Sequence, residues 1–568
     1  MRPGACVLAA VLFLAAGCAC GEDDGGGVAP PPPTDGIYFA DATAAAGLAG
    51  FVQENGEREK LFIVESIGAG VAFLDYDLDG DLDAYLSNGS SLEGFLEGAH
   101  PADALYAGDG EGGFRDVTAE VGLGDRHWTN GVRVADYNGD GWPDLMLTNY
   151  GPNVLYRNVR GHFSDVTAEA GVGDPRWSTG SCFLDHDKDG DLDLYVANYL
   201  HFDREWIEAN QPRRKYRGVS VSYGPVGLPG AADIFYENTG GGRFADVSAA
   251  VGIADTKRFG FQSVAFDYDD DGWIDVYVAN DSEPNLLWRN QGDRTFVDMA
   301  FRAGLAYNQQ GLAQAGMGVA LGDYDGDLLL DLYVTNFAED YYTLYRNQGG
   351  GLFTDVTHRV KLGQATMSSL GWATALIDLD NDADVDLFMV NGHVFPQVDL
   401  FELGTKYRQR NQAFENVGNG FVAVESLGAL EVVRCSRGAA FGDYDNDGDV
   451  DVLVGNLDAA PTLYRNDTRN QGNWIKLRLV GAGGNRDAIG ARVYVTAGGR
   501  EQVRAVGSAA GWLSSDDPRI HVGIGAAETV ERVRVVWPDG SEEVVEDLPA
   551  RRLVTIEEGR GAVAVKEL

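Results

Sequence analysis

Seven short stretches of this sequence place oxygen-bearing side chains at alternate positions, a pattern that suits the binding of a cation. The clearest stretch runs from Asp443 to Asp451, with aspartate at positions 1, 3, 5, 7 and 9 and Gly448 at position 6. Carboxylates two residues apart in a tight turn can point at one centre, and glycine permits the left-handed backbone that the turn needs. Calcium, a hard cation that takes about six to eight oxygen ligands, fits this layout best.

Without a cation, the carboxylates of one loop would repel one another. Two of them about 5 Å apart, at an effective dielectric constant of about 20, cost roughly 3 kcal/mol. We therefore predict that the loops close around calcium, with up to seven ions in all. The predicted ligands are the residues at positions 1, 3, 5, 7 and 9 of each loop: Asp75, Asp77, Asp79, Asp81, Asp83; Asp136, Asn138, Asp140, Trp142, Asp144; Asp185, Asp187, Asp189, Asp191, Asp193; Asp267, Asp269, Asp271, Trp273, Asp275; Asp323, Asp325, Asp327, Leu329, Asp331; Asp378, Asp380, Asp382, Asp384, Asp386; and Asp443, Asp445, Asp447, Asp449, Asp451.

Two of the loops lack glycine at position 6. The fifth loop has Leu328 there and the sixth has Ala383. Because a side chain disfavours the positive φ that glycine accepts freely, we expect these two sites to bind calcium less tightly.

Other calcium motifs fit the spacing poorly. An EF-hand needs a glutamate at loop position 12, where this chain has apolar residues such as Leu86 and Val454. The calcium-binding β-helix needs its repeats in tandem, and these loops lie far apart. A single loop of this kind could be a solvated turn, but seven in the same register favour metal binding.

The same short sequence motifs surround each loop. An apolar run such as Val71–Leu74 precedes the loop, and a second such as Leu194–Asn198 follows it. Then come a Leu-Tyr-Arg-Asn motif, as at Leu155–Asn158, and a Phe-x-Asp-Val-Thr motif, as at Phe114–Thr118. Four β-rich segments separated by turns form one propeller blade. We therefore predict an all-β fold, a seven-bladed β-propeller over residues 37–469 with calcium-binding loops.

The repeats also indicate how the ring of propeller blades closes. The seventh repeat reaches Asn466 without a following Phe-x-Asp-Val-Thr segment, whereas an unpaired copy, Phe39–Thr43, precedes the first repeat. We expect this N-terminal strand to complete the last blade and hide the edges that an open sheet would expose.

The N-terminus has the features of an export signal. Arg2 gives a basic start, and the apolar run Val7–Ala16 is too short to span a bilayer. Leu14–Cys18 resembles the bacterial lipobox, so we predict a lipoprotein signal peptide over residues 1–17 and lipidation of Cys18. Residues 18–36, rich in glycine and proline, then form a tether. The expected location is the outer membrane or cell surface, with ordinary secretion as the alternative.

The charge of the chain excludes one class of partner. The formal net charge is −43, and the seven loops supply much of the acidity. A surface this acidic is unsuited to binding the phosphates of nucleic acid. We expect a monomer that contacts a membrane only through its lipid anchor.

After the repeats, residues 470–568 change in character. Alternating strands begin at Trp474–Leu479 and recur at Ala491–Val495 and Arg532–Trp537, which indicates a small β-sandwich packed on the ring. Together with the repeats, motifs such as Asn485–Ala491 and Val536–Gly540 resemble the cartilage acidic protein family, with FG-GAP or VCBS repeats and a C-terminal ASPIC/UnbV domain. The resemblance implies a calcium-binding, secreted or surface-attached protein without an established enzyme activity.

Strand order suggests where a partner would bind. In a four-stranded meander, connections alternate between the two faces, so the calcium loops share one face with the turns between the third and fourth strands. We hypothesise that the opposite face binds a protein or a glycan, because aromatic and arginine side chains make good anchors. The alternative is that these side chains line the channel and pack between blades. They are Trp128, Trp177, Phe259, Trp372, Arg434 and Arg437.

We do not expect catalysis, and no catalytic residue is predicted. The sequence contains no Gly-x-Ser-x-Gly, His-Glu-x-x-His or P-loop motif. His393, at the end of a predicted second strand, fits a structural donor better than a base. The alternative function is a calcium-dependent polysaccharide lyase or hydrolase, which would need a basic residue and calcium together in one cleft.

Overall fold

The computed structural model describes residues 36–97, 100–254, 256–425, 428–469, 471–507 and 511–567. The predicted signal peptide, Cys18 and all of the predicted tether except Gly36 lie outside the described residues. The described residues all belong to one compact unit. None of the helices in the described ranges is long and apolar enough to cross a membrane.

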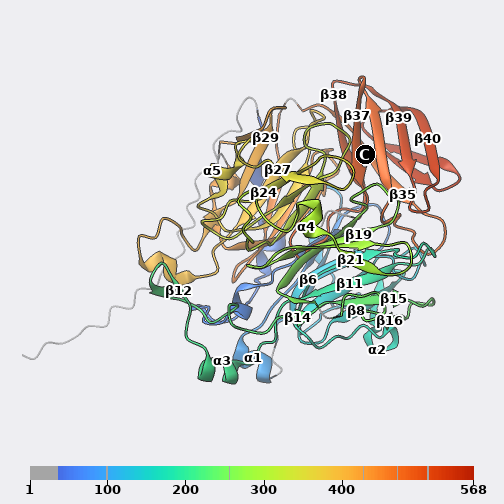
Figure 1. The fold of residues 1–568 in the computed structure, drawn as a ribbon. Coiled ribbons are helices and arrows are strands. Elements are labelled where there is room, and N and C mark those ends of the chain that lie inside the picture. Colours follow the sequence, from blue (N-terminus) through green and yellow to red (C-terminus); the bar gives the residue numbers. More distant parts are fainter. Residues whose placement is uncertain are drawn as a thin grey trace, which may run out of the picture. The chain divides into compact units, whose positions relative to one another are not determined.

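Seven four-stranded antiparallel sheets follow one another along the chain, and we call them blades 1 to 7 (Figure 1). Blade 1 contains β2 (Val71–Leu74), β3 (Asp83–Leu86), β4 (Ala104–Gly108) and β5 (Phe114–Asp116); blade 2, β6 (Trp128–Ala135), β7 (Asp144–Tyr150), β8 (Val154–Val159) and β9 (His162–Asp165); blade 3, β10 (Ser178–Leu184), β11 (Asp193–Asn198), β15 (Ile234–Asn238) and β16 (Phe244–Asp246). Blade 4 contains β18 (Gly260–Phe266), β19 (Asp275–Asn280), β20 (Leu286–Asn290) and β21 (Phe296–Asp298); blade 5, β22 (Val319–Gly322), β23 (Asp331–Val334), β24 (Thr343–Asn347) and β25 (Phe353–Asp355); blade 6, β26 (Gly371–Ile377), β27 (Asp386–Asn391), β29 (Gln412–Asn416) and β30 (Phe421–Ala423).

Blade 7 is completed from the other end of the chain. It contains β32 (Ser436–Gly442), β33 (Asp451–Asn456) and β34 (Thr462–Asn466), and its fourth strand is β1 (Phe39–Asp41). β1 pairs antiparallel with β34, and Phe39 lies opposite Asn466. The first strands of the blades contact one another in a closed circuit, from β2 through β6, β10, β18, β22, β26 and β32 back to β2. The sheets therefore form a β-propeller, closed by the N-terminal strand as the sequence indicated.

Short helices and small sheets lie in the connections between strands. The α-helices are α1 (Leu92–Glu97), α2 (Thr167–Ala170), α3 (Arg204–Asn210), α4 (Ala300–Ala303) and α5 (Leu362–Thr366), and the 3₁₀ helices are η1 (Leu48–Gly50), η2 (Ile63–Ser66), η3 (Pro396–Leu400) and η4 (Ala429–Glu431). The two-stranded sheets pair β12 (Lys215–Tyr216) with β13 (Val219–Ser220), β14 (Ala231–Ala232) with β17 (Lys257–Arg258), and β28 (Gln409–Arg410) with β31 (Val433–Arg434).

The chain after the propeller forms two further four-stranded sheets, drawn in orange and red in Figure 1. One contains β35 (Asn473–Val480), β38 (Ile520–Gly525), β41 (Arg552–Glu557) and β42 (Gly561–Glu567); the other contains β36 (Arg492–Ala497), β37 (Arg500–Ala505), β39 (Thr529–Val536) and β40 (Glu542–Pro549). Apolar side chains from both sheets, such as Leu477 and Val533, share one buried core. Alternation of apolar and polar residues along these strands thus produces a β-sandwich.

A segment of this C-terminal domain enters the channel at the propeller axis. Residues 512–517, which we call the channel segment, run beside the first strands of the blades and bond to their backbones. Ser515 donates its N–H to Val71 O at 3.1 Å and accepts from Phe73 N at 3.0 Å. Leu513 accepts from Val132 N at 3.0 Å, and Asp517 N donates to Phe441 O at 2.9 Å. The C-terminal domain therefore occupies part of the channel.

The positions of the strand residues that the channel segment contacts show how this segment is oriented. Trp512 packs on Phe261 and Trp372, which lie at the starting ends of β18 and β26, far from the aspartate loops. At the other end, Asp517 hydrogen-bonds to Phe441, which lies just before the loop that begins at Asp443. The segment thus spans the propeller from the face opposite the loops to the loop face.

Candidate metal centres

The seven aspartate-rich loops join the first and second strands of the blades. In every blade the aspartate at position 9 is the first residue of the second strand, as Asp83 is in β3 and Asp451 in β33. In six loops its carboxylate accepts from the backbone at position 2, which in loop 7 is the bond from Tyr444 N to Asp451 Oδ2 at 3.2 Å. The aspartate at position 1 accepts from position 6, as in the bond from Gly448 N to Asp443 Oδ2 at 3.0 Å. The backbone itself therefore aims these carboxylates.

Position 6 has a left-handed backbone in the fifth and sixth loops despite their side chains. Leu328 has φ 68° and Ala383 has φ 80°, so both loops keep the shape that glycine gives the others. A second left-handed residue at position 4 was not anticipated, for example Leu78 at φ 60° and Asn446 at φ 57°. Asn446 and the glycines at position 4 of the second and fifth loops were the sequence signal that could have revealed it.

Buried oxygen atoms without protein donors make these loops suited to a cation. Within the described residues, buried carboxylate oxygens without a hydrogen-bond partner occur in five loops: Asp75 Oδ1, Asp185 Oδ1, Asp269 Oδ1, Asp325 Oδ1 and Asp445 Oδ1. Sets such as Asp75, Asp77 and Asp83 each offer oxygens that lie within 4.8 Å of one another. Buried unpaired carboxylate oxygens are costly, and a hard cation would satisfy them. These clusters can therefore hold metal ions.

Burial disfavours the charged form of these carboxylates. It raises the pKa of Asp83 to about 8 and that of Asp144 to about 9. At position 1, burial raises the pKa of Asp75 to about 6 and that of Asp378 to about 8. Repulsion from neighbouring aspartates raises each of these pKa values further. The positive charge that the protein places near these carboxylates therefore does not balance their negative charge.

Some loops carry a cation of their own. In loop 4, Arg289 of the Leu-Trp-Arg-Asn motif contacts Asp269 at 2.7 Å and Asp271 at 2.6 Å. Arg346 binds Asp327 of loop 5 at 2.9 Å in the same way. Sequence reasoning found the repeated motif but not this role for its arginine, because the pairing depends on how β20 and β24 lie beside the loops.

The asparagine of the same motif ties neighbouring blades together. Asn158 N donates to Asp144 Oδ1 of its own blade at 2.7 Å. Its side chain donates to Tyr76 O in the loop of the preceding blade at 2.8 Å. Asn466 repeats both bonds, to Asp451 at 2.8 Å and to Leu379 O at 2.8 Å. Each such asparagine thus positions a candidate ligand and links two loops.

The C-terminal domain covers the loop face. Lys476 Nζ lies 2.7 Å from Asp443 Oδ2, and both side chains are buried. Asp487 accepts from Asp136 N at 2.7 Å, and Arg492 donates to Asp267 O at 2.7 Å. His521 Nε2 lies 2.7 Å from Asn381 Oδ1. Arg519 also donates to Gly80 O of loop 1 at 3.0 Å. Five of the loops are therefore in direct contact with this domain. The sequence indicated a sandwich packed on the ring but not which loops it would meet.

Four of the six predicted binding-face residues are buried. Trp128 donates to Asn55 Oδ1 at 2.8 Å, and Trp177 packs on Tyr199 at 5.0 Å between ring centroids. Arg437 lies 4.0 Å from the ring centroid of Trp372, and each has less than 2% exposure. For these four the structure favours the packing alternative, because the Tyr199–Asp233 insertion and the inter-blade loops cover them. Phe259 and Arg434 remain partly exposed.

Together, the fold and the loops define a class: a repeat β-propeller with acidic, metal-suited loops and an appended β-sandwich. A family described as FG-GAP-like repeat matches residues 75–147, 136–196, 267–334 and 323–389, and one described as ASPIC and UnbV matches residues 481–563. The chain therefore combines FG-GAP-like repeats with an ASPIC and UnbV domain, the combination that its resemblance to the cartilage acidic protein family implies.

Relatives and solved structures differ in how far they match. Cartilage acidic protein 1 of Homo sapiens is 28% identical over 280 residues, covering 47% of this chain and 39% of the relative. The chain thus spans about two fifths of the length of the curated relatives it matches. A lectin from Agrocybe aegerita that recognises non-reducing terminal N-acetylglucosamine has a TM-score of 0.38 at 15% identity, with 65% of this chain and 89% of that chain covered. The exotype rhamnogalacturonan lyase YesX has a TM-score of 0.34 at 14% identity, with 70% and 71% covered.

Proposed function

We propose that this protein is an exported, calcium-stabilised binding module that holds a protein or glycan partner on the propeller face opposite the aspartate loops. The observation that carries the proposal is the occupation of the loop face and the channel by the C-terminal domain. One broad face of the propeller therefore lies under its own chain, and the other is the surface through which a partner can be reached.

Calcium is the cation that the donors favour. Each site offers only oxygen ligands from its aspartates, apart from His186 in loop 3, and oxygen-rich sites of this kind suit calcium. Bound at a loop, calcium would neutralise the clustered carboxylates. Since the position 9 aspartates begin the second strands, the ion would join two strands of a blade at their shared loop, which is a structural role.

Export agrees with this role. The lipobox-like Leu14–Cys18 favours attachment at the outer membrane or cell surface through lipidated Cys18, followed by the glycine- and proline-rich tether. Calcium is abundant outside the cytoplasm relative to its concentration inside, so weak sites can remain filled there.

A second candidate function is a calcium-dependent polysaccharide lyase or hydrolase. A basic side chain beside a candidate calcium ligand does occur, as Lys476 beside Asp443. That pair is buried at the domain interface, which favours a structural use of the lysine. Incubation with a panel of acidic polysaccharides, followed by measurement of new reducing ends, distinguishes the two functions.

The proposed function is tested on glycan and protein arrays probed with calcium and with EGTA. We expect binding to a defined set of partners that depends on calcium. The test variant replaces Val433 and Arg434, on the face opposite the loops, with bulky residues. This variant should bind the partner less and should bind calcium as the wild type does. Cleavage of a polysaccharide would contradict the proposed function. So would array binding that survives in this variant but is lost when the exposed residues of the outer strands are substituted.

A further inference from the structure

A cavity of 410 Å³ opens at the propeller axis on the face opposite the loops. Its lining includes residues at the starts of first strands, such as Phe261 and Trp372, and residues just after second strands, such as Asp281 and Phe395. The loops occupy the other ends of these strands. The cavity therefore lies on the face that the proposed function assigns to a partner.

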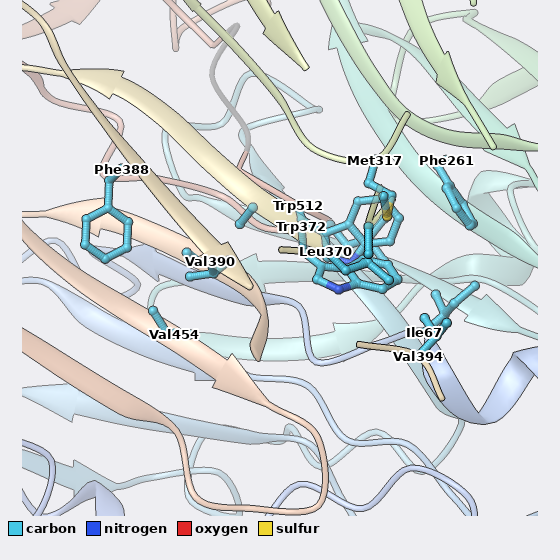
Figure 2. Packing of buried hydrophobic residues seen from close by; sticks show 14 of the residues in the cluster. Ile67, Phe261, Met317, Leu370, Trp372, Phe388, Val390, Val394, Val454 and Trp512 are labelled. Atoms are coloured by element: carbon cyan, nitrogen blue, oxygen red, sulfur yellow. The ribbon is translucent and has the colours of Figure 1, made fainter. Parts of the chain in front are cut away.

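Aromatic side chains form the floor of this cavity. Phe261 and Trp372 both line it, and both pack on Trp512 of the channel segment, with ring centroids at 5.0 and 4.8 Å. Figure 2 shows Trp372 and Trp512 together beside Met317, with Ile67 and Val394 nearby. The C-terminal domain thus supports the cavity from below, and its walls are largely apolar.

The polar lining of the cavity is predominantly acidic. It contains Asp281, Glu339 and Asp340 but a single cationic residue, Arg214. Both oxygens of Asp281 are used, by Tyr199 Oη at 2.6 Å and Ser282 Oγ at 2.8 Å. Asp281 is therefore fixed in place and contributes charge rather than a free acceptor.

Asp340 is the acceptor best placed to receive a ligand. Its Oδ1 accepts from Gln314 Nε2 at 2.7 Å, and in the described part of the chain no hydrogen bond reaches its Oδ2. Burial raises the pKa of Asp340. Glu339 beside it accepts from Tyr216 Oη and Arg217 Nε, both at 2.5 Å, through Oε1 alone. The two adjacent carboxylates leave one oxygen each for a donor from outside.

We propose that this cavity binds a lysine or arginine side chain of a partner protein. Its apolar stem would lie against Trp372 and Met317, and its cationic end would reach Asp340 and Glu339. Glu339 already pairs with Arg217, so Asp340 is the carboxylate that lacks a cationic partner. An anionic sugar would meet this carboxylate, and a neutral one would leave it without a counter-charge. This inference rests on the proposed function, since it names the chemistry recognised on the same face.

Saturation-transfer NMR on the calcium-loaded full chain tests the inference, because it detects weak ligands of a large protein. The probes are Nα-acetyl-lysine N-methylamide and its uncharged counterpart, Nα-acetyl-norleucine N-methylamide. We expect saturation of the lysine side chain and little of the norleucine. Asp340→Asn should weaken lysine binding by about tenfold, as for loss of a charged hydrogen-bond partner.

Two variants separate the cavity from its surroundings. Ala313→Trp should abolish lysine binding, because Ala313 lines the cavity and is partly exposed, so a large side chain would fill the space without disturbing a core. Glu205→Gln removes an exposed carboxylate of α3 and should change nothing. Equal saturation of both probes, or full lysine binding by Ala313→Trp, would overturn the inference.

The failure of this inference can be told apart from failure of the proposed function. If the lysine probe does not bind while calcium-dependent partners are still found on the arrays, the cavity assignment is wrong and the binding module remains. If neither binds, both are wrong. Competition of the lysine probe with an array partner supports both.

Discussion

At the scale of single residues, the loops show how backbone bonds and buried charge shape one another. The aspartates at positions 1 and 9 are aimed by backbone N–H groups, and some of their remaining oxygens are buried without donors. The types and spacing of these residues were readable from the sequence, since alternate carboxylates around a glycine have few other uses. Their counterions were not, because Arg289 and Lys476 approach from a neighbouring strand and from another domain.

Ala383 allows a test of backbone strain in loop 6. Its φ of 80° is left-handed, where glycine is relaxed and alanine costs about 1 kcal/mol. Ala383→Gly should therefore stabilise the calcium-loaded protein by up to about 1 kcal/mol and tighten calcium binding at this loop. Calorimetric unfolding and calcium titration measure both. Ala383→Val is the matched control and should act in the opposite direction; the same sign for the two variants would show that φ is not the cause.

His393 gives a pH dependence with a definite sign. Burial, and then the charge of Arg437, lowers the pKa of His393 to about 3 in the folded protein. The unfolded chain binds a proton near pH 6.5 and the folded chain does not, so this contribution to stability is present above pH 6.5 and is lost as pH falls.

Relative to His393→Asn, the wild type should lose about 2 kcal/mol of unfolding free energy between pH 6.5 and pH 5. The comparison cancels the titration of the aspartates, which both proteins share. Urea unfolding at the two pH values measures it. A difference that does not change with pH would mean that His393 takes up a proton in the folded state.

At the scale of elements, the repeated strands and a sandwich packed on the ring followed from the sequence, but the particular contacts between the two domains did not. Apolar runs beside each loop became the first and second strands, and the unpaired Phe39 segment became the outer strand of blade 7. Because these patterns are local or repeated, they can be recognised in the sequence. The channel segment is neither: Trp512 and its neighbours carry no periodicity, and their place in the propeller depends on the finished ring.

The channel segment should matter for stability well beyond its length. Trp512 is fully buried between Trp372 and Phe261, so Trp512→Ala should lower the unfolding free energy by about 3–5 kcal/mol. Trp206→Ala is the matched control, because Trp206 is 45% exposed on α3, and it should change stability little. Denaturant unfolding of the two variants decides between a packed channel and an incidental contact: equal effects would contradict the packing described.

At the scale of the whole molecule, opposite charges hold the two domains together around the loops. The chain carries a formal charge of −43, and basic residues of the C-terminal domain meet the acidic loops of the propeller. The burial of most of the predicted anchor residues also arises at this scale. Trp128, Trp177, Trp372 and Arg437 have the residue types of anchors, but insertions from distant blades bury them, and only the assembled face shows that a cavity, rather than an exposed aromatic surface, lies there.

The central claim is that divalent cations balance the carboxylates of the propeller loops, and scanning calorimetry with and without calcium tests it most directly. In excess calcium we expect a melting temperature well above that in EGTA, and restoration of the higher value when calcium is added back, because an ion that binds only the folded state stabilises it. Magnesium at the same concentration should restore less, since the loops offer more oxygens than its octahedral shell requires. An unchanged melting temperature in EGTA would contradict the account.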